Sequence, residues 1–406
     1  MKKGTYILIG AAGGFISGGP IYQRNKAIFM KQQGWNVYYL SCCHGKVYIH
    51  GLQEFIVGVF TFLCKPAYRY PAKYQNRLLE YILTRIPSID GEVVVETGTD
   101  YTAYWGELLA ERVQGKHIVG LLDEYNNHIT PKVSAFYQFK YHRKELACIS
   151  DEVMWHIFGD LIPQCMQHPY SLAFYCTNSL DTYQPKWVTN IPGADLVVGY
   201  IGRLEKNAVP FVVDGVKKYA LKNPNRRITF LCIGGSDDHL ASQHIYDSLS
   251  DVKNVNVFIT GLLFPIPISC VERCDLVFST AGSCSVGVMA GVPTVRIHQL
   301  TNVPEGFITR LKSREYMVCP NGNTVYDYIC MFCQGKNIPK LEKYDLTQNR
   351  TDAIGYFNRH IDFLKNSVQA KEYFDFSLIP LSLRERCQRF SMSWLGMNIY
   401  SKIWRD

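Results

Sequence analysis

The stretch that decides the fold reads Val198-Gly199-Tyr200-Ile201-Gly202-Arg203-Leu204-Glu205-Lys206-Asn207. An apolar run passes into a glycine and then into a polar loop, which is how a buried strand ends. Further apolar, β-branched runs follow and alternate with stretches of helical spacing; they span residues 228–233, 255–259, 276–278 and 293–297. This alternation predicts a parallel sheet covered by helices, so the second half of the chain is an α/β domain.

Length and composition extend this prediction to the whole chain. With 406 residues, of which 47% are hydrophobic and 19% charged, the protein is globular and too long for one ordinary α/β domain. A formal net charge of +8 is moderate for this length and does not predict nucleic acid as a partner. Phosphate-bearing substrates or an anionic membrane surface fit this charge equally well.

Fourteen cysteines are scattered without the spacing of a disulfide scaffold. We expect free thiols in a reducing cytoplasm. Cys330 and Cys333 form a lone CxxC, and a structural zinc site needs two further ligands, so we predict core packing and no metal.

The first residues predict a βαβ unit. The apolar run 5–9 is short and lacks a cleavage site after it, which favours a buried strand over a signal peptide. A glycine-rich loop follows, then a helix over 21–33 and a second strand over 36–41. The loop lacks the GxGxxG spacing of dinucleotide-binding proteins. Gly18 and Gly19, near the helix start, would let an anionic ligand approach the backbone; a tight turn without a ligand is the alternative.

The segment 55–77 joins the most apolar run of the chain to interleaved tyrosine and basic residues. The run is too short to span a bilayer, and we favour a buried strand. The alternative is a peripheral membrane patch, with aromatic groups in the interface and basic groups on anionic lipid.

A group of polar residues follows the strand predicted over 117–122. Open α/β sheets place ligands beyond the carboxyl ends of their strands. Asp123, Glu124 and His128 are therefore candidates for acceptor binding or proton transfer, with solvated loop charges as the alternative.

Four segments together resemble the family 4-like glycosyltransferases. The segment 176–182 resembles their "pNGvDt" motif, and 200–207 resembles their "vGRL..eKn" strand and loop. Residues 274–279 and 289–295 are similar to "aDvfv.ps" and "EAma.GvPvv". Each motif alone is weak, but the four occur in the family's order along most of the chain.

The resemblance implies a GT-B fold, with two Rossmann-like domains facing across a cleft. The expected domains are an acceptor-binding domain over 1–190, a nucleotide-sugar domain over 191–385, and a C-terminal helix over 386–406 that crosses back to the first domain. We expect the large apolar residues of 391–404 to be buried against that domain.

The resemblance also implies a donor site without a metal. Arg203 and Lys206 match the family's basic pair and would stabilise the departing diphosphate. The donor would also contact the turn after the strand 230–233 and the start of a helix near 283. These residues are Gly234, Gly235, Gly282, Ser283, Cys284 and Ser285. Ordinary surface charges, a plain turn and a serine cap are the respective alternatives.

The chain departs from the family at its paired glutamates. The family carries two of them eight residues apart, whereas residues 281–290 contain no acid. Glu305, one loop later, is the candidate replacement.

The resulting expectation is a cytoplasmic glycosyltransferase without a cofactor, acting on a nucleotide-sugar and a saccharide or lipid-linked saccharide in surface polysaccharide or glycolipid biosynthesis at the inner face of the membrane. A catalytically silent GT-B protein and a sugar-nucleotide epimerase are the alternatives.

Overall fold

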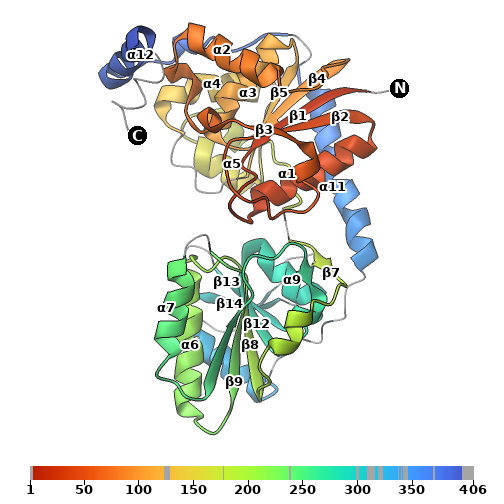
Figure 1. Cartoon of the computed structure of the whole chain (residues 1–406), viewed down its shortest axis with the longest axis vertical. Helices are drawn as coiled ribbons and strands as arrows, with labels where there is room; N and C mark the ends of the chain where they lie inside the picture. Colours follow the sequence, from red (N-terminus) through yellow and green to blue (C-terminus); the bar gives the residue numbers. More distant parts are fainter. Residues whose placement is uncertain are drawn as a thin grey trace. The chain divides into compact units, whose positions relative to one another are not determined.

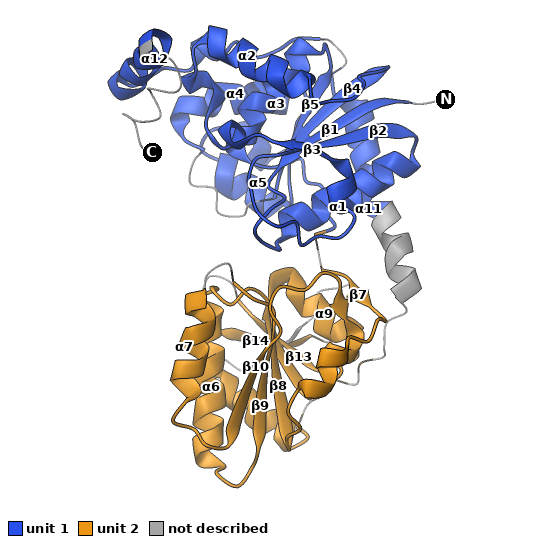
Figure 2. Ribbon diagram, viewed as in Figure 1, with its two compact units in different colours: residues 1–175, 352–406 blue, residues 176–351 orange. Residues whose placement is uncertain are grey.

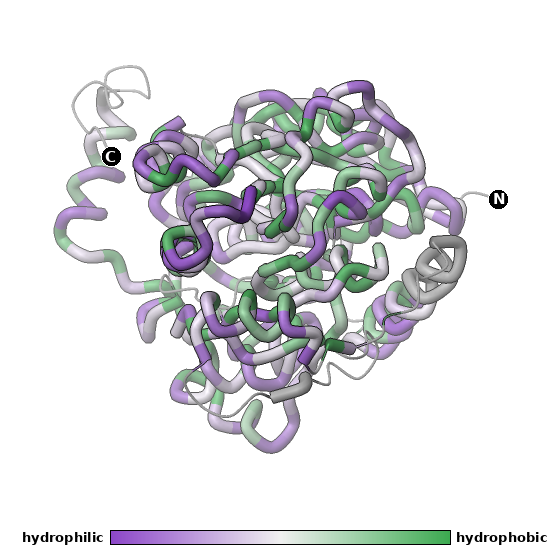
Figure 3. Tube along the Cα trace, turned by 90° about the horizontal axis from the view of Figure 1, so that it is seen from below, coloured by the Kyte–Doolittle hydropathy of each residue, from purple (hydrophilic) through white to green (hydrophobic). Residues whose placement is uncertain are grey.

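A computed structural model of the chain (Figure 1) describes residues 3–122, 129–176, 178–236, 239–298, 301–308, 316–318, 323–336, 338–339, 341, 346–368 and 371–395. It divides into two compact units, which Figure 2 shows in different colours. Unit 1 comprises residues 1–175 and 352–406, and unit 2 comprises residues 176–351. Hydrophobic and hydrophilic residues are interspersed along the chain (Figure 3).

Unit 1 is a doubly wound parallel sheet of six strands in the order β3-β2-β1-β4-β5-β6. The strands are β1 (Gly4–Gly10), β2 (Trp35–Ser41), β3 (Ile56–Val59), β4 (Glu92–Thr97), β5 (Lys116–Leu121) and β6 (Leu146–Cys148). All residues of β1 are buried, as expected for a central parallel strand that is covered on both faces.

Helices of unit 1 pack on this sheet, with α1 on β1 and β2 and α3 on β4 and β5. The helices are α1 (Gly18–Gln32), α2 (Ala72–Leu83), α3 (Asp100–Arg112), α4 (Ser134–His142), α5 (Asp151–Phe158), α11 (Leu346–Asn366) and α12 (Leu383–Leu395). Short 3₁₀ turns connect them: η1 (Gln53–Phe55), η2 (Thr61–Cys64), η3 (Ala67–Arg69), η4 (Pro131–Val133), η5 (Pro163–Met166) and η8 (Phe376–Leu378). Among the described residues, no helix is long and apolar enough to cross a bilayer.

Unit 2 contains a seven-stranded sheet in the order β10-β9-β8-β12-β13-β14-β15. Its strands are β8 (Leu196–Ile201), β9 (Ile228–Ile233), β10 (Val255–Ile259), β12 (Leu276–Thr280), β13 (Thr294–Ile297), β14 (Pro304–Ile308) and β15 (Tyr316–Val318). Its other elements are β7 (Leu180–Asp181), β11 (Ile266–Pro267), α6 (Ala208–Lys222), α7 (His239–Leu249), α8 (Ile268–Val271), α9 (Cys284–Met289), α10 (Val325–Cys333), η6 (Lys186–Asn190) and η7 (Ala281–Ser283). The first five strands of the sheet are parallel, and only β14 and β15 run antiparallel to their neighbours. The apolar runs from which the sheet was predicted are its five parallel strands, with the run 255–259 as the edge strand β10.

The unit boundaries differ from the predicted domain boundaries. The first lies at residue 175 instead of 190, and the return to unit 1 lies within α11 instead of at residue 386. The reason is the apolar face of the second half of α11, where Phe357 and Leu364 are buried in unit 1. His360 lies on the same face of α11. Its Nδ1 atom is 3.2 Å from the hydroxyl oxygen of Tyr22 in α1, and its Nε2 atom is 3.2 Å from the carbonyl oxygen of Ala173.

The apolar run 55–63 belongs to the core of unit 1. Phe60 and Leu63 are fully buried, and so are the neighbouring Tyr68 and Tyr70. The strand itself, β3, covers only Ile56–Val59 and is partly buried, with Val59 38% exposed, so the predicted buried strand is shorter and more exposed than expected, and the buried residues of the run lie on its flanks. Phe62, Tyr68 and Tyr70 pack against Trp105 and Tyr104 of α3, which favours core packing over the alternative of a peripheral membrane patch.

The C-terminal helix α12 lies in unit 1, as the GT-B resemblance implied, but its packing was predicted wrongly. Met392 is buried, whereas the Trp394 side chain is 78% exposed. Polar groups of the helix occupy the face against unit 1 and displace the large aromatic groups toward solvent. The rest of the predicted stretch, 396–404, lies outside the described residues.

Candidate functional site

The candidate site of unit 2 lies between β8 and β12, where the chain changes from adding strands on one side of β8 to adding them on the other. Strands β8 and β12 are parallel neighbours, with β9 and β10 on one side and β13 on the other. Sheets of this kind usually bind ligands in a crevice outside the carboxyl ends of the strands at such a point, so the loops after β8 and β12 mark the expected ligand crevice of unit 2. These loops are residues 202–207 and the 3₁₀ turn η7.

Close backbone contact fixes the loop after β8. A Cβ atom on Gly234 would lie 1.9 Å from the carbonyl oxygen of Gly202, so only glycine fits at position 234. The amide of Leu204 donates to the carbonyl oxygen of Gly235 at 3.2 Å, and the Leu204 side chain is buried. The close neighbour of Gly234 and Gly235 is thus the loop that carries the predicted basic pair, and contact of this turn with a donor stays a prediction.

Lys206 joins the two loops across the crevice. Its ammonium Nζ donates to the Thr280 hydroxyl at 2.8 Å, and Thr280 is the last residue of β12. This bond holds a cation above the carboxyl ends of both central strands. Arg203 lies in the same loop and pairs with Glu205 at 3.2 Å, with nearly half of its side chain exposed. Because exposed pairs of this kind contribute little, the guanidinium can exchange Glu205 for an anionic ligand at small cost.

The next two strands supply a second ion pair. Arg296 of β13 and Glu305 of β14 bring Nε and Oε2 to 2.7 Å, and about a quarter of each side chain is exposed. The two groups are close but lack hydrogen-bond alignment with each other. Glu305 was predicted from the sequence, but Arg296 was not. The feature that could have revealed Arg296 is that it is the single charged residue within the predicted strand 293–297.

In the turn after β12, the backbone and the Cys284 thiol lie in different environments. Gly282 is exposed, while Ser283 and Ser285 are partly buried. The Cys284 thiol packs in the core beside Val288 and Ile308, so only its backbone can face a ligand. Burial raises the pKa of Cys284 to about 12, partly opposed by the charges of Arg296 and Lys206. The two cations therefore act on the same small region at the edge of the sheet.

The corresponding edge of unit 1 is the glycine-rich loop between β1 and α1. Strands β1 and β4 are neighbours where the strand order reverses, so this loop leaves the sheet at its ligand edge. Gly18 and Gly19 form the first turn of α1, and a Cβ atom on Gly19 would meet no atom within 4 Å. Asp123, Glu124 and His128 lie outside the described residues.

A thiol fastens this glycine-rich loop to the end of β2. The Cys43 sulfur lies 3.3 Å from both the amide nitrogen and the carbonyl oxygen of Gly13. Hydrogen bonds from Cys42 and from the Gly13 amide, opposed by partial burial, lower the pKa of Cys43 to about 6. Cys43, next to the glycine-rich loop of unit 1, therefore ionises more readily than an ordinary thiol.

A buried polar cluster between the sheet and α1 lies next to the same loop. Glu96 of β4 accepts hydrogen bonds from the hydroxyl groups of Tyr6 and Tyr22, and Lys26 of α1 lies 3.6 Å from the carboxylate. All four side chains are buried. Since buried charges and hydroxyls require partners, the cluster fixes the position of α1 on the sheet and hence that of its first turn.

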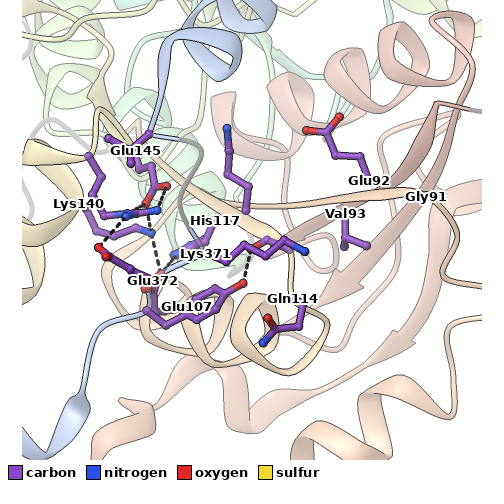
Figure 4. Close-up of a pocket in the computed structure, with 15 residues that line it drawn as sticks. Gly91, Glu92, Val93, Glu107, Gln114, His117, Lys140, Glu145, Lys371 and Glu372 are labelled. Carbon is purple, nitrogen blue, oxygen red and sulfur yellow. Dashed lines mark hydrogen bonds and ion pairs between the residues drawn. The ribbon is translucent and has the colours of Figure 1, made fainter.

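A pocket of about 200 Å³ lies at the opposite edge of unit 1, next to the amino ends of β4 and β5 (Figure 4). Its inner wall is an ion network in which Lys140 donates to Glu107 and Glu145 at 2.7 Å each. Arg143 and His117 complete the network through Glu145 and Glu107. Cationic and anionic side chains line the pocket in comparable numbers, and those of the network form ion pairs with one another. We therefore interpret the network as stabilising unit 1.

Because of this network, we expect the free energy of unfolding of unit 1 to decrease as the pH falls. Burial and the nearby Lys140 charge lower the pKa of His117 to about 4. Lys140 and His117 outweigh burial and lower the pKa of Glu107 to about 2. Both groups bind protons more readily in the unfolded chain, so stability present at pH 7 is lost from about pH 6.5 downward. The expected loss is a few kcal/mol by pH 4, since one pKa unit corresponds to about 1.4 kcal/mol.

Urea unfolding at pH 7 and pH 4.5 measures this loss. Tryptophan fluorescence suits it, because every tryptophan except Trp187 belongs to unit 1. His117→Asn is expected to flatten the pH dependence between 6.5 and 4, and exposed His142→Asn is expected to leave it unchanged. Equal slopes for wild type and His117→Asn would contradict this assignment.

No group of three or more metal-ligating side chains occurs in the part of the chain that the structure describes. Cys330 and Cys333 are partly buried against the core of unit 2, as predicted, and the Tyr219 hydroxyl donates to the Cys333 sulfur at 3.2 Å.

Comparison with solved structures identifies the architecture. A glycosyltransferase from Rickettsia africae has 14% identity, a TM-score of 0.60, and coverage of 89% of this chain and 100% of its own. HepE from Anabaena, solved with UDP and glucose, has 12% identity, a TM-score of 0.59, and coverage of 89% and 99%. The pneumococcal O-GlcNAc transferase GtfA, solved with UDP and GlcNAc, has 8% identity, a TM-score of 0.55, and coverage of 90% and 100%.

No family model and no curated protein matches the sequence itself. The likeness is therefore one of structure, and it extends over nearly the whole length of the chain and of each solved protein. With two Rossmann-like units and a C-terminal segment that returns to the first, the chain has the GT-B fold of these glycosyltransferases.

Proposed function

We propose that the protein transfers a sugar from a nucleoside-diphosphate sugar to a hydroxyl acceptor. The observation that carries this proposal is the position of Lys206, fixed to Thr280 over the carboxyl ends of β8 and β12. Arg203 in the same loop adds a second cation, and the two loops leave the sheet where ligands bind in this fold. HepE and GtfA, which share the fold, were solved with UDP and a sugar, which supports the same donor class here.

These residues match the electrostatic demand of the reaction. The bond between the anomeric carbon and the diphosphate oxygen breaks, and the bonding electrons stay on the departing phosphate. Fixed cations stabilise that developing charge because they need no rearrangement as it forms. The Lys206 ammonium acts as a point charge and the Arg203 guanidinium as a two-pronged donor. Glu305, held by Arg296, offers carboxylate oxygens to hydroxyl groups of the donor.

We extend the proposal to a hexosyltransferase acting in surface polysaccharide or glycolipid biosynthesis, on a saccharide or lipid-linked saccharide at the inner face of the membrane. The support is chemical: a moderately basic chain suits anionic donors and anionic lipid surfaces. We propose no cofactor. Asp123, Glu124 and His128 remain proposed acceptor-side residues, since they follow β5 in the sequence.

A thermal shift measurement with UDP, GDP, ADP, CMP and dTDP tests the donor site. A ligand at about one hundred times its dissociation constant adds roughly 2.7 kcal/mol, which raises the midpoint by a few degrees in a protein of this size. We expect one nucleotide to give a selective shift that Arg203→Ala reduces. Arg227→Ala is the matched control, because Arg227 of unit 2 also forms an exposed pair, with Asp195 at 3.4 Å.

Two results would count against the proposal. If no nucleotide shifts the midpoint, the absence of a carboxylate from residues 281–290 gains weight and a catalytically silent GT-B protein becomes the better conclusion. If a nucleotide shifts wild type and Arg203→Ala equally, a donor site exists but does not use Arg203.

A further inference from the structure

Helix α12 places large apolar side chains in solvent. Leu383 and Trp394 are each 78% exposed, and Phe390 is 64% exposed. These residues, together with exposed Cys387, recur at the spacing of one helix face. The Phe390 and Trp394 rings lie next to each other, with centroids 6.0 Å apart. We call this face the α12 stripe.

The opposite face of the same helix is polar and points into unit 1. Glu385 and Gln388 are buried there together with Met392. Arg69 reaches the Glu385 carboxylate at 3.0 Å, and Lys132 donates to its other oxygen. This anchoring fixes the rotation of the helix, so the apolar groups cannot turn inward without breaking the ion pairs of a buried carboxylate. The helix is therefore inverted relative to an ordinary surface helix, which turns its apolar side inward.

The charges on the exposed part of α12 all have one sign. Arg384 and Arg386 are exposed and Arg389 is partly exposed, while Glu385, the single acid of the helix, is buried in its ion pairs. A helix with Trp, Phe and Leu on one side and arginine along its flanks has the composition of helices that lie in the interface of anionic bilayers. Each arginine near such a surface adds attraction that salt weakens.

We propose that the α12 stripe binds an anionic membrane surface, with Phe390 and Trp394 in the interface and the flanking arginines on lipid phosphates. A second copy of the chain fits less well. A two-fold contact through this helix would bring the arginines of both copies together, and three large side chains form a small interface for a stable dimer. A membrane also covers a narrow stripe without requiring a complementary shape.

Flotation of the full-length protein with vesicles tests this proposal. Vesicles of neutral phosphatidylcholine are compared with vesicles containing about a third phosphatidylglycerol, at low and high salt and without nucleotide. We expect wild type to float with the anionic vesicles at low salt and to be released at high salt. The double variant Phe390→Ser, Trp394→Ser should lose at least tenfold in partitioning, as should the triple variant in which the three arginines become glutamine.

The matched control is Phe211→Ser, Leu240→Ser, which removes two exposed apolar groups from α6 and α7 of unit 2 and should float like wild type. Brominated lipids should quench more fluorescence in wild type than in Trp394→Phe, because Trp394 contributes only where it reaches the acyl region. Equal flotation of wild type and both α12 variants would overturn the proposal. So would a dimer that these variants dissociate, in the absence of vesicle binding.

The membrane proposal does not rest on sugar transfer. Vesicle binding is measured without donor, and nucleotide binding is measured without lipid. Failure of one therefore leaves the other standing, and the α12 variants should retain the nucleotide-induced thermal shift.

Discussion

Lys206→Ala is expected to lower the rate of sugar transfer by about 10²- to 10³-fold, the usual effect of removing one fixed group that stabilises developing charge. The reason is its position: the Nζ atom is held 2.8 Å from the Thr280 hydroxyl, between the loops after β8 and β12. Alanine leaves no cation at that point. The measurement is turnover of the nucleotide-sugar identified by thermal shift, as transfer or as donor hydrolysis.

The control for Lys206→Ala is Lys217→Ala. Lys217 lies on α6 of the same unit and pairs with Asp251 at 2.8 Å on the surface, away from the crevice. It should behave as wild type. Lys206→Arg tests geometry separately, because it keeps the charge but replaces a compact ammonium by a planar fork. Wild-type turnover in Lys206→Ala, with Lys217→Ala also unchanged, would remove Lys206 from the proposed mechanism.

Glu107→Ala is expected to destabilise unit 1 by about 3–5 kcal/mol, the cost of breaking a buried ion pair by removing one partner. Glu107 accepts from Lys140 at 2.7 Å, from His117 at 2.8 Å and from the amide of Phe374 at 3.0 Å. The substitution leaves three buried donors short of an acceptor. One of them belongs to the C-terminal segment, so the return of the chain to unit 1 also weakens. Urea unfolding at pH 7 measures the loss.

Glu111→Ala is the matched control, because Glu111 lies one turn later on α3 and is exposed. Surface changes of this kind usually stay within about 0.5 kcal/mol. Adding Lys140→Met to Glu107→Ala should recover part of the loss, since it removes the uncompensated charge, and the double-mutant cycle then gives the coupling between the two residues. A Glu107→Ala protein as stable as the Glu111→Ala control would show that the network contributes little.

A site residue that the sequence did not predict depends on a contact between residues on two different strands. Arg203, Lys206, Gly234 and Gly235 were predicted because the short segments that carry them, each directly after an apolar strand, resemble motifs of the glycosyltransferase family. Arg296 was missed because a single charge within an apolar strand does not reveal its partner. The antiparallel pairing of β13 with β14, which is absent from the predicted parallel pattern, brings Glu305 beside it.

The sequence by itself predicted the parallel strands that apolar runs mark, the helix after the first strand and the α/β class, since these depend on the spacing of apolar residues and on glycine turns within a few residues of one another. Tertiary structure alone decided the domain boundary within α11 and the outward direction of Trp394. Both follow from partners far away in sequence: Tyr22 meets His360, and Arg69 and Lys132 hold Glu385. The GT-B resemblance and the large apolar residues of 391–404 predicted a helix that buries its aromatic groups, whereas Arg69 and Lys132 hold the buried Glu385 carboxylate toward unit 1 and Trp394 is exposed.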